Sequence, residues 1–399
     1  MIINLKSNVL QKEGKQMRCT KAVIFKENIK NNIREVKNNL HKNTKLCIAV
    51  KADGYGCGAI ETAKIAEQEG VEYLAIATTQ EGIELRKNNI KSKLLLLSLC
   101  TPSEFQDLID FDITPLVFDS EYIDELKKHV KNNNKSNFEV FLAIDTGMGR
   151  IGCYSDEAPS LAQKINNQNI LKLSGVITHF AVSDSITEEN QNYTRKQYND
   201  FISAIENIKK IGINPGICTC SSSAALFAFP EMQMDMVRPG IVIYGYYPDE
   251  VTKEYLHNQG IDINLKPVMQ LETAVVSIRE IKKGTSISYG RTWIADKDTN
   301  IAVLPIGYAD GLLRRNSPNM KVTINGKEYP ICGRICMDQC MIDIGLNNKD
   351  VKRWDKVIIF GPKQQEALQD AADIAKMTNT IPYEIITSVS AKRVQKYFI

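Results

Sequence analysis

Short apolar runs of strand length alternate with longer amphipathic segments along the first two thirds of the chain. The runs are continuously hydrophobic rather than alternating, which is typical of strands buried on both faces. They fall at residues 46–50, 73–77, 94–99, 114–118, 138–144, 173–178, 216–220 and 234–238. Helix-like segments lie between them, most clearly at residues 59–69, 79–88, 121–130 and 187–210. The pattern predicts successive βα units around a parallel sheet.

A run of eight such units is the number that closes a barrel, so we predict a (β/α)8 TIM barrel over residues 18–263. A doubly wound open sheet is the alternative that the same pattern allows. Residues 1–17 are polar and lack periodicity. They predict a disordered N-terminal extension, and Met17 offers a second start of translation.

The spacing of apolar runs and turn residues changes after about residue 264. Short apolar strands follow at residues 274–281, 300–306 and 357–360, and Asn325-Gly326 is a hairpin signal. One helix-like segment covers residues 364–377. We therefore predict a smaller, mostly-β C-terminal domain over residues 264–399.

Composition narrows the class of protein. With 43% hydrophobic and 24% charged residues, the 399-residue chain is typical of a soluble globular protein. A net charge of +3 with interspersed signs argues against nucleic acid as a partner. The longest apolar stretch, residues 94–100, is far below the roughly 20 residues of a membrane helix. Ten cysteines in a chain without a secretory signal indicate free thiols, so we expect a cytoplasmic protein without required disulfides.

Residues just past the strand ends are the candidates for chemistry, because active sites of barrels lie there. Lys51 follows the first run and begins a glycine-rich turn. Desolvation would lower the pKa of such a lysine toward Schiff-base chemistry, whereas the plainer interpretation is a side chain that reaches solvent. Further polar groups follow later runs at residues 145–152, 178–180, 221–225 and 238–241. The last of these falls where barrels commonly bind a phosphate.

The cysteines Cys332, Cys336 and Cys340 are spaced differently from zinc-knuckle ligands and have no histidine nearby in sequence. We therefore expect no metal, and strand residues are the better interpretation of the segment from Pro330 to Ile344.

Six motifs then identify a resemblance. The run AVKADGYG at residues 49–56 resembles the pyridoxal-phosphate signature of alanine racemases. Further motifs of that family match in order: DTGMGRIG at 145–152, RPGI at 238–241, SYG at 288–290, GYADG at 307–311 and GRICMDQ at 333–339. The resemblance covers residues 18–399. It implies a (β/α)8 barrel plus a β domain, assembled as a head-to-tail homodimer in which the partner's β domain completes each site.

The resemblance also implies roles. Lys51 would hold pyridoxal 5′-phosphate through its amine and act as one base, and Tyr289 from the other subunit would be the second base. Arg238 would face the pyridine nitrogen, and His179, in the cofactor pocket, would orient Tyr289. Arg150 and the backbone N–H of Met337 would bind the substrate carboxylate. The cofactor phosphate would be held by Tyr55, Ser223, Gly240, Ile241 and Tyr383, and the substrate entrance would be lined by Tyr308, Asp184, Arg314, Arg334 and Ile381.

Several positions depart from the family pattern. Ala143 stands where many members have a lysine that braces the carboxylate-binding arginine, and Thr219 replaces a histidine that supports the arginine at the ring nitrogen. Cys57 replaces another common histidine. The expected activity is alanine racemisation that supplies D-alanine for peptidoglycan. Two alternatives stay open: a serine or broad-specificity racemase on the same fold, and a cofactor-carrying protein without racemase activity.

Overall fold

Parallel strands in the first part of the chain form a closed barrel. In this computed structural model, which describes residues 18–317 and 319–399, the seven strands from β2 to β8 lie side by side in chain order. The eighth strand, β9, lies beside β2. The ring closes between β8 and β9, where the Arg238 N–H donates to the Ser221 carbonyl at 2.9 Å. The strands are β2 (Lys45–Ala49), β3 (Tyr73–Ile76), β4 (Lys93–Leu96), β5 (Ile113–Val117), β6 (Phe138–Ala143), β7 (Leu171–Ile177), β8 (Ile217–Thr219) and β9 (Met236–Val237). The predicted barrel is confirmed, and the open-sheet alternative is wrong.

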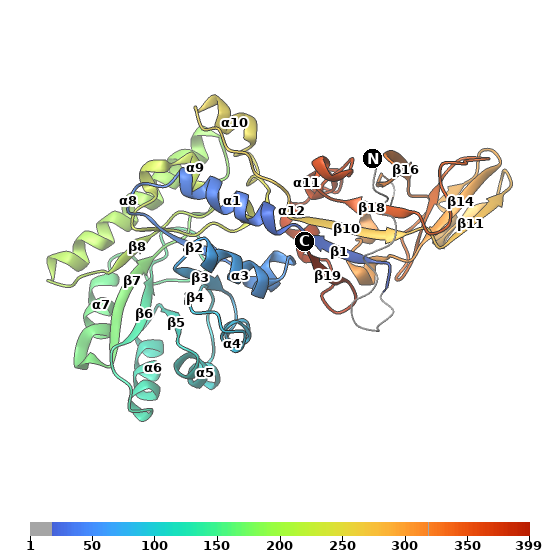
Figure 1. Cartoon of the computed structure of the whole chain (residues 1–399). Coiled ribbons are helices and arrows are strands. Elements are labelled where there is room, and N and C mark those ends of the chain that lie inside the picture. Colours follow the sequence, from blue (N-terminus) through green and yellow to red (C-terminus); the bar gives the residue numbers. More distant parts are fainter. Residues whose placement is uncertain (1–17, 318) are drawn as a thin grey trace, which may run out of the picture.

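Helices surround the barrel on its outer face (Figure 1). Several of these helices begin at a side-chain cap: Thr78 and Glu81 form a capping box, and Asp119 and Thr187 accept from backbone N–H groups of the helices they precede. The helices are α1 (Lys26–Asn38), α3 (Ala59–Gln68), α4 (Thr79–Lys87), α5 (Phe105–Asp110), α6 (Ser120–Asn132), α7 (Ala158–Asn166), α8 (Glu188–Lys210), α9 (Ala225–Ala228) and α10 (Lys253–Asn258).

The second domain is built on a six-stranded sheet in the order β16-β15-β18-β10-β1-β19. Two smaller sheets, β11-β14-β17 and β12-β13, extend it. The strands are β10 (Met269–Ala274), β11 (Ser277–Ile281), β12 (Ser286–Ile287), β13 (Trp293–Ile294), β14 (Thr299–Leu304), β15 (Lys321–Ile324), β16 (Lys327–Pro330), β17 (Cys340–Asp343), β18 (Lys356–Phe360), β19 (Gln395–Phe398) and the N-terminal β1 (Lys21–Ile24). The domain boundary at residues 263–264 stays a prediction, and β1 joins the second sheet although it precedes the barrel.

The predicted hairpin turn of this domain is confirmed, whereas one predicted strand and the predicted helix have different bounds. Asn325 and Gly326 have φ values of 49° and 74°, which are the angles of a type I′ hairpin turn between β15 and β16. The apolar run at residues 274–281 spans the end of β10 and all of β11 rather than one strand. The helix predicted at 364–377 begins only at α11 (Ala371–Met377), because Glu366 has a φ of 72° and Asp370 caps the helix; α12 (Pro382–Thr387) follows.

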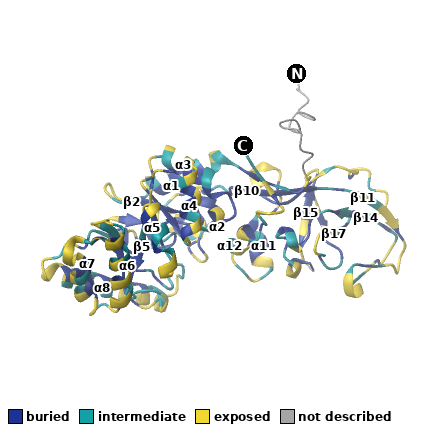
Figure 2. Ribbon diagram, turned by 90° about the horizontal axis from the view of Figure 1, so that it is seen from below, coloured by how far each residue is buried: buried dark blue, intermediate teal, exposed yellow. Residues whose placement is uncertain are grey.

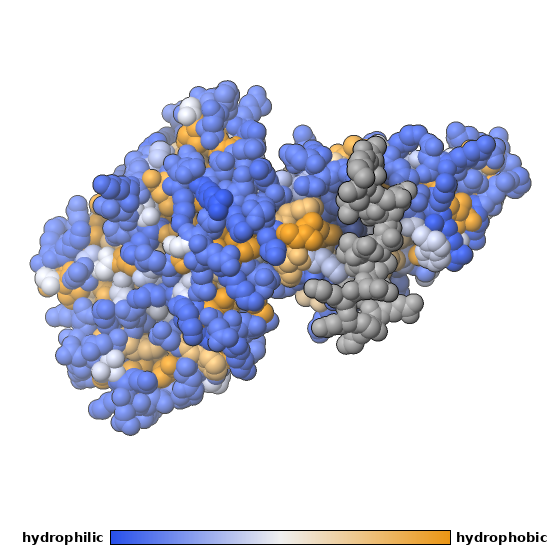
Figure 3. All heavy atoms as spheres, in the orientation of Figure 1, coloured by the Kyte–Doolittle hydropathy of each residue, from blue (hydrophilic) through white to orange (hydrophobic). Residues whose placement is uncertain are grey.

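A continuous hydrophobic core runs from the barrel into the second domain. Buried residues concentrate on the barrel strands and on the central sheet (Figure 2). The surface is mostly hydrophilic on the face drawn in Figure 3, with an apolar patch where the two lobes meet. No helix in residues 18–317 or 319–399 is long and apolar enough to span a membrane.

Candidate active site

The segment after β2 turns in the left-handed sense. Ala52, Asp53, Gly54 and Tyr55, within α2 (Lys51–Tyr55), have φ values between 52° and 59°. Left-handed backbone costs about 1–2 kcal/mol for each residue other than glycine, so other parts of the molecule must hold it. The turn leaves the side chain of Lys51 at the carboxyl-end mouth of the barrel.

Groups from two other elements fix this turn. Glu81 on α4 accepts from the Ala52 N–H at 2.7 Å. Lys396 on β19 of the second domain forms an ion pair with Asp53. A Cβ at Gly56 would lie 2.3 Å from the carbonyl oxygen of Ile386, so only glycine fits where α12 packs against the turn. Both domains therefore determine where Lys51 lies.

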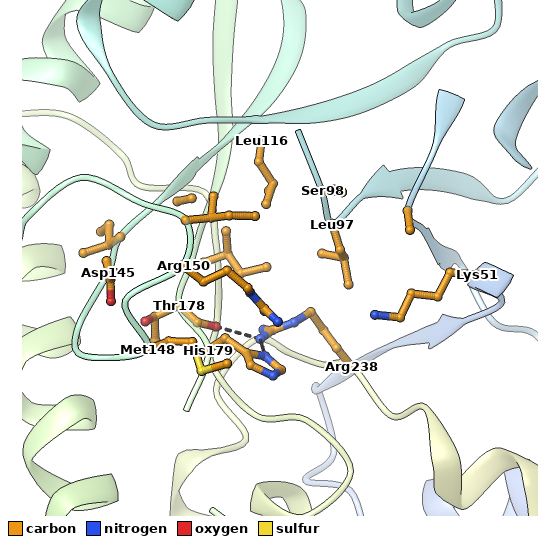
Figure 4. A pocket seen from close by; sticks show the side chains of 15 residues that line it. Lys51, Leu97, Ser98, Leu116, Asp145, Met148, Arg150, Thr178, His179 and Arg238 are labelled. Carbon is orange, nitrogen blue, oxygen red and sulfur yellow. Dashed lines mark hydrogen bonds between the residues drawn. The ribbon is translucent and has the colours of Figure 1, made fainter. Parts of the chain in front are cut away.

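Two adjoining cavities open at the barrel mouth, with volumes of about 250 and 370 Å³. Lys51, His179 and Arg238 line both. Figure 4 shows the side chains of Lys51, Arg150, His179 and Arg238 pointing into the same space. The sequence-predicted residues that the structure brings together around the two cavities are Lys51, Tyr55, Arg150, His179, Asp184, Ser223, Arg238, Gly240, Ile241 and Tyr383.

Arg238 is buried, and neutral acceptors hold it. Its Nη1 donates to Thr219 Oγ1 at 2.5 Å, and its Nη2 donates to the carbonyls of Thr178 at 2.6 Å and Cys220 at 3.2 Å. Thr219 Oγ1 itself donates to the Met236 carbonyl at 2.6 Å, so its lone pairs remain for the guanidinium. Burial lowers the pKa of Arg238 to about 10, which still leaves it charged at neutral pH. Thr219 thus supports Arg238 at the position where the family pattern has histidine.

His179 is a neutral imidazole in this cavity. Burial, and then the charges of Arg238 and Arg150, lower its pKa to about 3. Its Nδ1 lies 3.4 Å from Arg238 Nη2. Because a guanidinium only donates, we assign Nδ1 as the acceptor and place the ring proton on Nε2. The imidazole can therefore donate one hydrogen bond from Nε2.

Lys51 and Arg150 make the cavity basic. Burial, and then the charge of Arg150, lower the pKa of Lys51, which favours its free amine. Arg150 is exposed and donates no hydrogen bond to a residue in the described ranges. Asp145 shapes the loop before it, accepting from the N–H groups of Gly147 at 2.8 Å and Gly149 at 3.1 Å. The guanidinium of Arg150 is thus available for an anion.

The second cavity ends in a cradle of neutral donors. The Gly240 N–H donates to Ser223 Oγ at 2.8 Å, and a Cβ on Gly240 would lie 2.4 Å from the Tyr55 hydroxyl oxygen. The Tyr55 ring stacks on the Tyr244 ring, with 4.8 Å between the ring centroids, and its centroid lies 5.9 Å from that of the Tyr383 ring. Burial raises the pKa of Tyr55 to about 12 and also raises that of Tyr383, so both hydroxyls stay protonated donors. Such a cradle fits the expected cofactor phosphate.

Except for Tyr383, the predicted site residues of the second domain do not line these cavities. Tyr289 and Met337 are 67% and 51% exposed and line a separate surface hollow. Tyr308 is 41% exposed, and Arg314 lies in another groove. Arg334 packs beside Gly290, while Ile381 shares a groove with Asp184 and Tyr383 near the barrel. One chain by itself therefore does not assemble the whole predicted site.

Sequence reasoning missed several residues at the cavities. Leu97, Ser98 and Met148 line them without having been singled out, and Glu81 and Lys396 hold the turn from outside. Met148 lies inside the DTGMGRIG motif, so its place near Arg150 could have been inferred. Lys396 gave no signal, because its partner Asp53 is far away in sequence.

Comparisons with known proteins find relatives that match over nearly the whole chain. Family models for the alanine racemase N-terminal and C-terminal domains match residues 24–248 and 268–398. A relative named alanine racemase from Treponema denticola is 49% identical over 385 residues, which is 96% of this chain and 99% of the relative. The structure of alanine racemase from Clostridium difficile 630 aligns with a TM-score of 0.89 at 35% identity, covering 96% and 97% of the two chains. The structure of alanine racemase from Bacillus anthracis with bound L-Ala-P aligns with a TM-score of 0.87 at 32% sequence identity. The alignment covers 97% of this chain and 96% of that one.

Proposed function

The chain belongs to the alanine racemase family, and from this premise we propose that it interconverts L-alanine and D-alanine with pyridoxal 5′-phosphate as cofactor. The observation that carries the proposal is the half-buried amine of Lys51 in a cavity that Arg150 and Arg238 also line. Asp145, the carboxylate in the same lining, accepts hydrogen bonds from the N–H groups of its own loop. Such a cavity favours a ligand that carries a phosphate and a carboxylate.

The residues present fit that cofactor. Tyr55, Ser223, Tyr383 and the N–H groups of Gly240 and Ile241 would hold its phosphate, and Arg238 would donate to its ring nitrogen. Because Arg238 stays charged and only donates, the ring nitrogen would remain an acceptor. When bound, the cofactor supplies a carbonyl for covalent attachment and withdraws electrons from the substrate Cα.

The protein's own groups then do the proton chemistry. Lys51, with its lowered pKa, would remove or return the Cα proton on one face of the substrate. Arg150 would bind the substrate carboxylate, together with the backbone N–H of Met337. Racemisation needs a second base on the opposite face, because return of a proton from the first face only restores the starting enantiomer.

Tyr289 would be that second base, supplied by the second copy of a head-to-tail homodimer. Its exposure of 67% is consistent with a side chain that completes another subunit's site. His179, neutral and with a free Nε2–H, would donate to the phenolic oxygen of that tyrosine and orient it. Tyr308, Arg314 and Arg334 would come from the same partner domain, and Asp184 and Ile381 from the barrel side of the entrance.

The test is a proton NMR time course of the protein loaded with pyridoxal 5′-phosphate in D2O, with L-alanine and L-serine in parallel and chiral analysis at the end. We expect Cα deuteration of alanine and approach to equal amounts of the two enantiomers. Comparable turnover of serine would indicate the broad-specificity alternative. Exchange without inversion, or no exchange, would contradict the proposal.

A cytoplasmic role in supplying D-alanine for peptidoglycan is the physiological part of the proposal, supported by the bacterial sources of the relatives. Expression of the gene in a bacterial D-alanine auxotroph should restore growth without added D-alanine. Continued dependence on D-alanine, despite active protein in the extract, would contradict this role.

A further inference from the structure

A buried carboxylate in the second domain lies behind two exposed loops. Asp310 is fully buried in η6 (Tyr308–Asp310), and Arg18 and Arg393 both contact it. Arg18 Nη1 lies 2.5 Å from Asp310 Oδ1, and Arg18 Nη2 lies 3.0 Å from Asp310 Oδ2. Arg393 Nε lies 3.0 Å from Asp310 Oδ1. Arg393 also donates to Asp338 at 2.7 Å. We call Arg18, Asp310, Asp338 and Arg393 the Asp310 cluster.

This cluster holds the first loop from behind. Asp310 Oδ2 accepts from the Gly307 N–H at 3.0 Å, which closes the turn that carries Tyr308. Arg18 Nη2 donates to the carbonyl of Pro305 at 2.7 Å, just before the turn. The Ser390 N–H donates to the Asp310 carbonyl at 3.1 Å, which ties the turn to the C-terminal segment.

The second loop is joined to the first through backbone hydrogen bonds. The Tyr308 N–H donates to the Cys336 carbonyl and the Ala309 N–H to the Met337 carbonyl, each at 3.0 Å. A Cβ at Gly307 would lie 2.3 Å from the Cys336 carbonyl oxygen, so the loops touch without an intervening side chain. Arg393 reaches this second loop as well, through Asp338 next to Met337.

The two loops present their side chains outward. Tyr308 is 41% exposed and Met337 51% exposed, so packing within the domain does little to fix them. Groups that must meet a substrate within tenths of an ångström need rigid support behind them. In this domain the support is electrostatic: two guanidinium groups on one buried carboxylate, each bond charge-assisted.

We propose that Asp310, acting through Arg393 and Arg18, is the positioning residue for the part of the site that the second domain contributes. It fixes the Met337 N–H that receives the substrate carboxylate and the Tyr308 side chain at the entrance. The inference rests on the proposed function for the roles of Met337 and Tyr308. It assigns to the Asp310 cluster a task beyond folding, namely substrate affinity in the partner's site.

Arg393→Met is the variant that tests the proposal. It removes one contact to Asp310 and the link to Asp338, while Arg18 still neutralises the carboxylate. We expect KM for both L-alanine and D-alanine to rise about tenfold with kcat changed less than about threefold, because a ground-state carboxylate contact is lost. Cofactor absorbance and molecular mass in solution should stay unchanged. Arg393→Lys, which keeps the charge, should recover part of the affinity.

Lys327→Met is the matched control, since it removes an exposed ion pair with Asp350 elsewhere in the same domain and should leave KM unchanged. Asp310→Asn would leave Arg18 without its counter-charge and Arg393 with Asp338 alone, and it risks unfolding. Arg18→Met therefore serves as the second variant, with the same expected rise in KM. Unchanged KM in both arginine variants, or a fall in kcat alone, would overturn the positioning role. A wild-type protein that does not racemise alanine would instead overturn the proposed function.

Discussion

Thr219 supports Arg238 with a hydroxyl group at the position where the family pattern has a histidine. Its hydroxyl accepts from Arg238 at 2.5 Å and donates to the Met236 carbonyl at 2.6 Å, so both polar partners are satisfied inside the barrel. A neutral acceptor leaves the full positive charge of the guanidinium available to a ligand. The position thus determines both the direction and the charge of the group proposed to face the ring nitrogen.

Thr219→Val should lower the free energy of unfolding by about 1–3 kcal/mol, because it leaves a buried donor and a buried carbonyl without partners. Thermal or denaturant unfolding of the apoprotein measures this loss. Thr219→Ser keeps the hydroxyl and should stay within about 1 kcal/mol of wild type. Equal losses in both variants would mean that the methyl group matters and not the hydrogen bond.

The lowered pKa of His179 makes the free energy of unfolding depend on pH, and the direction of the shift gives the sign of that dependence. Its pKa falls from 6.5 to about 3 on folding, so the unfolded chain binds more protons between those values. The free energy of unfolding contributed by His179 is therefore present above pH 6.5 and is lost as the pH falls toward 3. In His179→Gln the melting temperature should decline less steeply with acid over this range. His41→Gln, at an exposed histidine, should keep the wild-type slope, and a wild-type slope in His179→Gln would contradict the assignment.

Single residues were predictable where the chain itself marks them. Lys51 and Arg238 stand directly after buried strands, so a barrel fold by itself requires both to lie at the same mouth. The support of Arg238 by Thr219 was not predictable, because it depends on side-chain geometry across β8 and β9. Asp310 lay inside a recognised motif, yet its arginine partners are remote in sequence and carried no local signal.

At the scale of elements, the left-handed turn after β2 depends on the distant strand β19. Lys396 pairs with Asp53, and Phe398 lies so close to Gly58 that a Cβ there would be 2.6 Å from its ring. The turn carries both Lys51 and Tyr55. Relaxation of its strained backbone would therefore move the amine and one phosphate ligand together.

Lys396→Met should raise the dissociation constant for pyridoxal 5′-phosphate by roughly tenfold, equivalent to about 1.4 kcal/mol. Titration of the apoprotein, followed by visible absorbance, measures it. Lys356→Met, which removes an exposed ion pair of the same sheet, is the control. Unchanged cofactor affinity in the Lys396 variant would show that the turn holds its shape without β19.

Barrel strands were predictable as elements because most of them contain a run of buried apolar residues, as β3 (YLAI) and β4 (KLLL) do. The four-residue strands β1 (KAVI) and β19 (QKYF) were not, since neither is long or apolar enough to stand out. The pairing of β1 with β19 on one side and with β10 on the other is purely tertiary. A periodic pattern reports burial along one segment and contains nothing about which remote segment lies beside it.

At the scale of the whole molecule, the proposed site is divided between two surfaces of one chain. Lys51 lies at the barrel mouth, whereas Tyr289 lies exposed on the second domain. This division makes a mixed dimer informative. In the proposed head-to-tail homodimer, one site of a dimer formed from a Lys51 variant and a Tyr289 variant would contain both substitutions, and the other would contain none.

Lys51→Ala and Tyr289→Phe should each reduce racemisation by more than about 10³-fold. Co-expression of the two variants at equal levels should restore about a quarter of wild-type activity, because half of the dimers are mixed and each of these has one intact site. Racemase assays on the purified mixture, with each variant alone as the baseline, measure the recovery. No recovery would mean that both residues act within the same subunit.

The position of β1 in the second sheet also sets the order in which the molecule is completed during synthesis. Ile24 leaves the ribosome among the earliest structured residues, but its partner Met269 follows only after the entire barrel has been translated. At about 5–20 residues per second, the wait is on the order of tens of seconds. During that time an unpaired strand edge is open to neighbouring nascent chains. A circularly permuted gene that begins at α1 and encodes residues 18–24 after β19 would remove this interval.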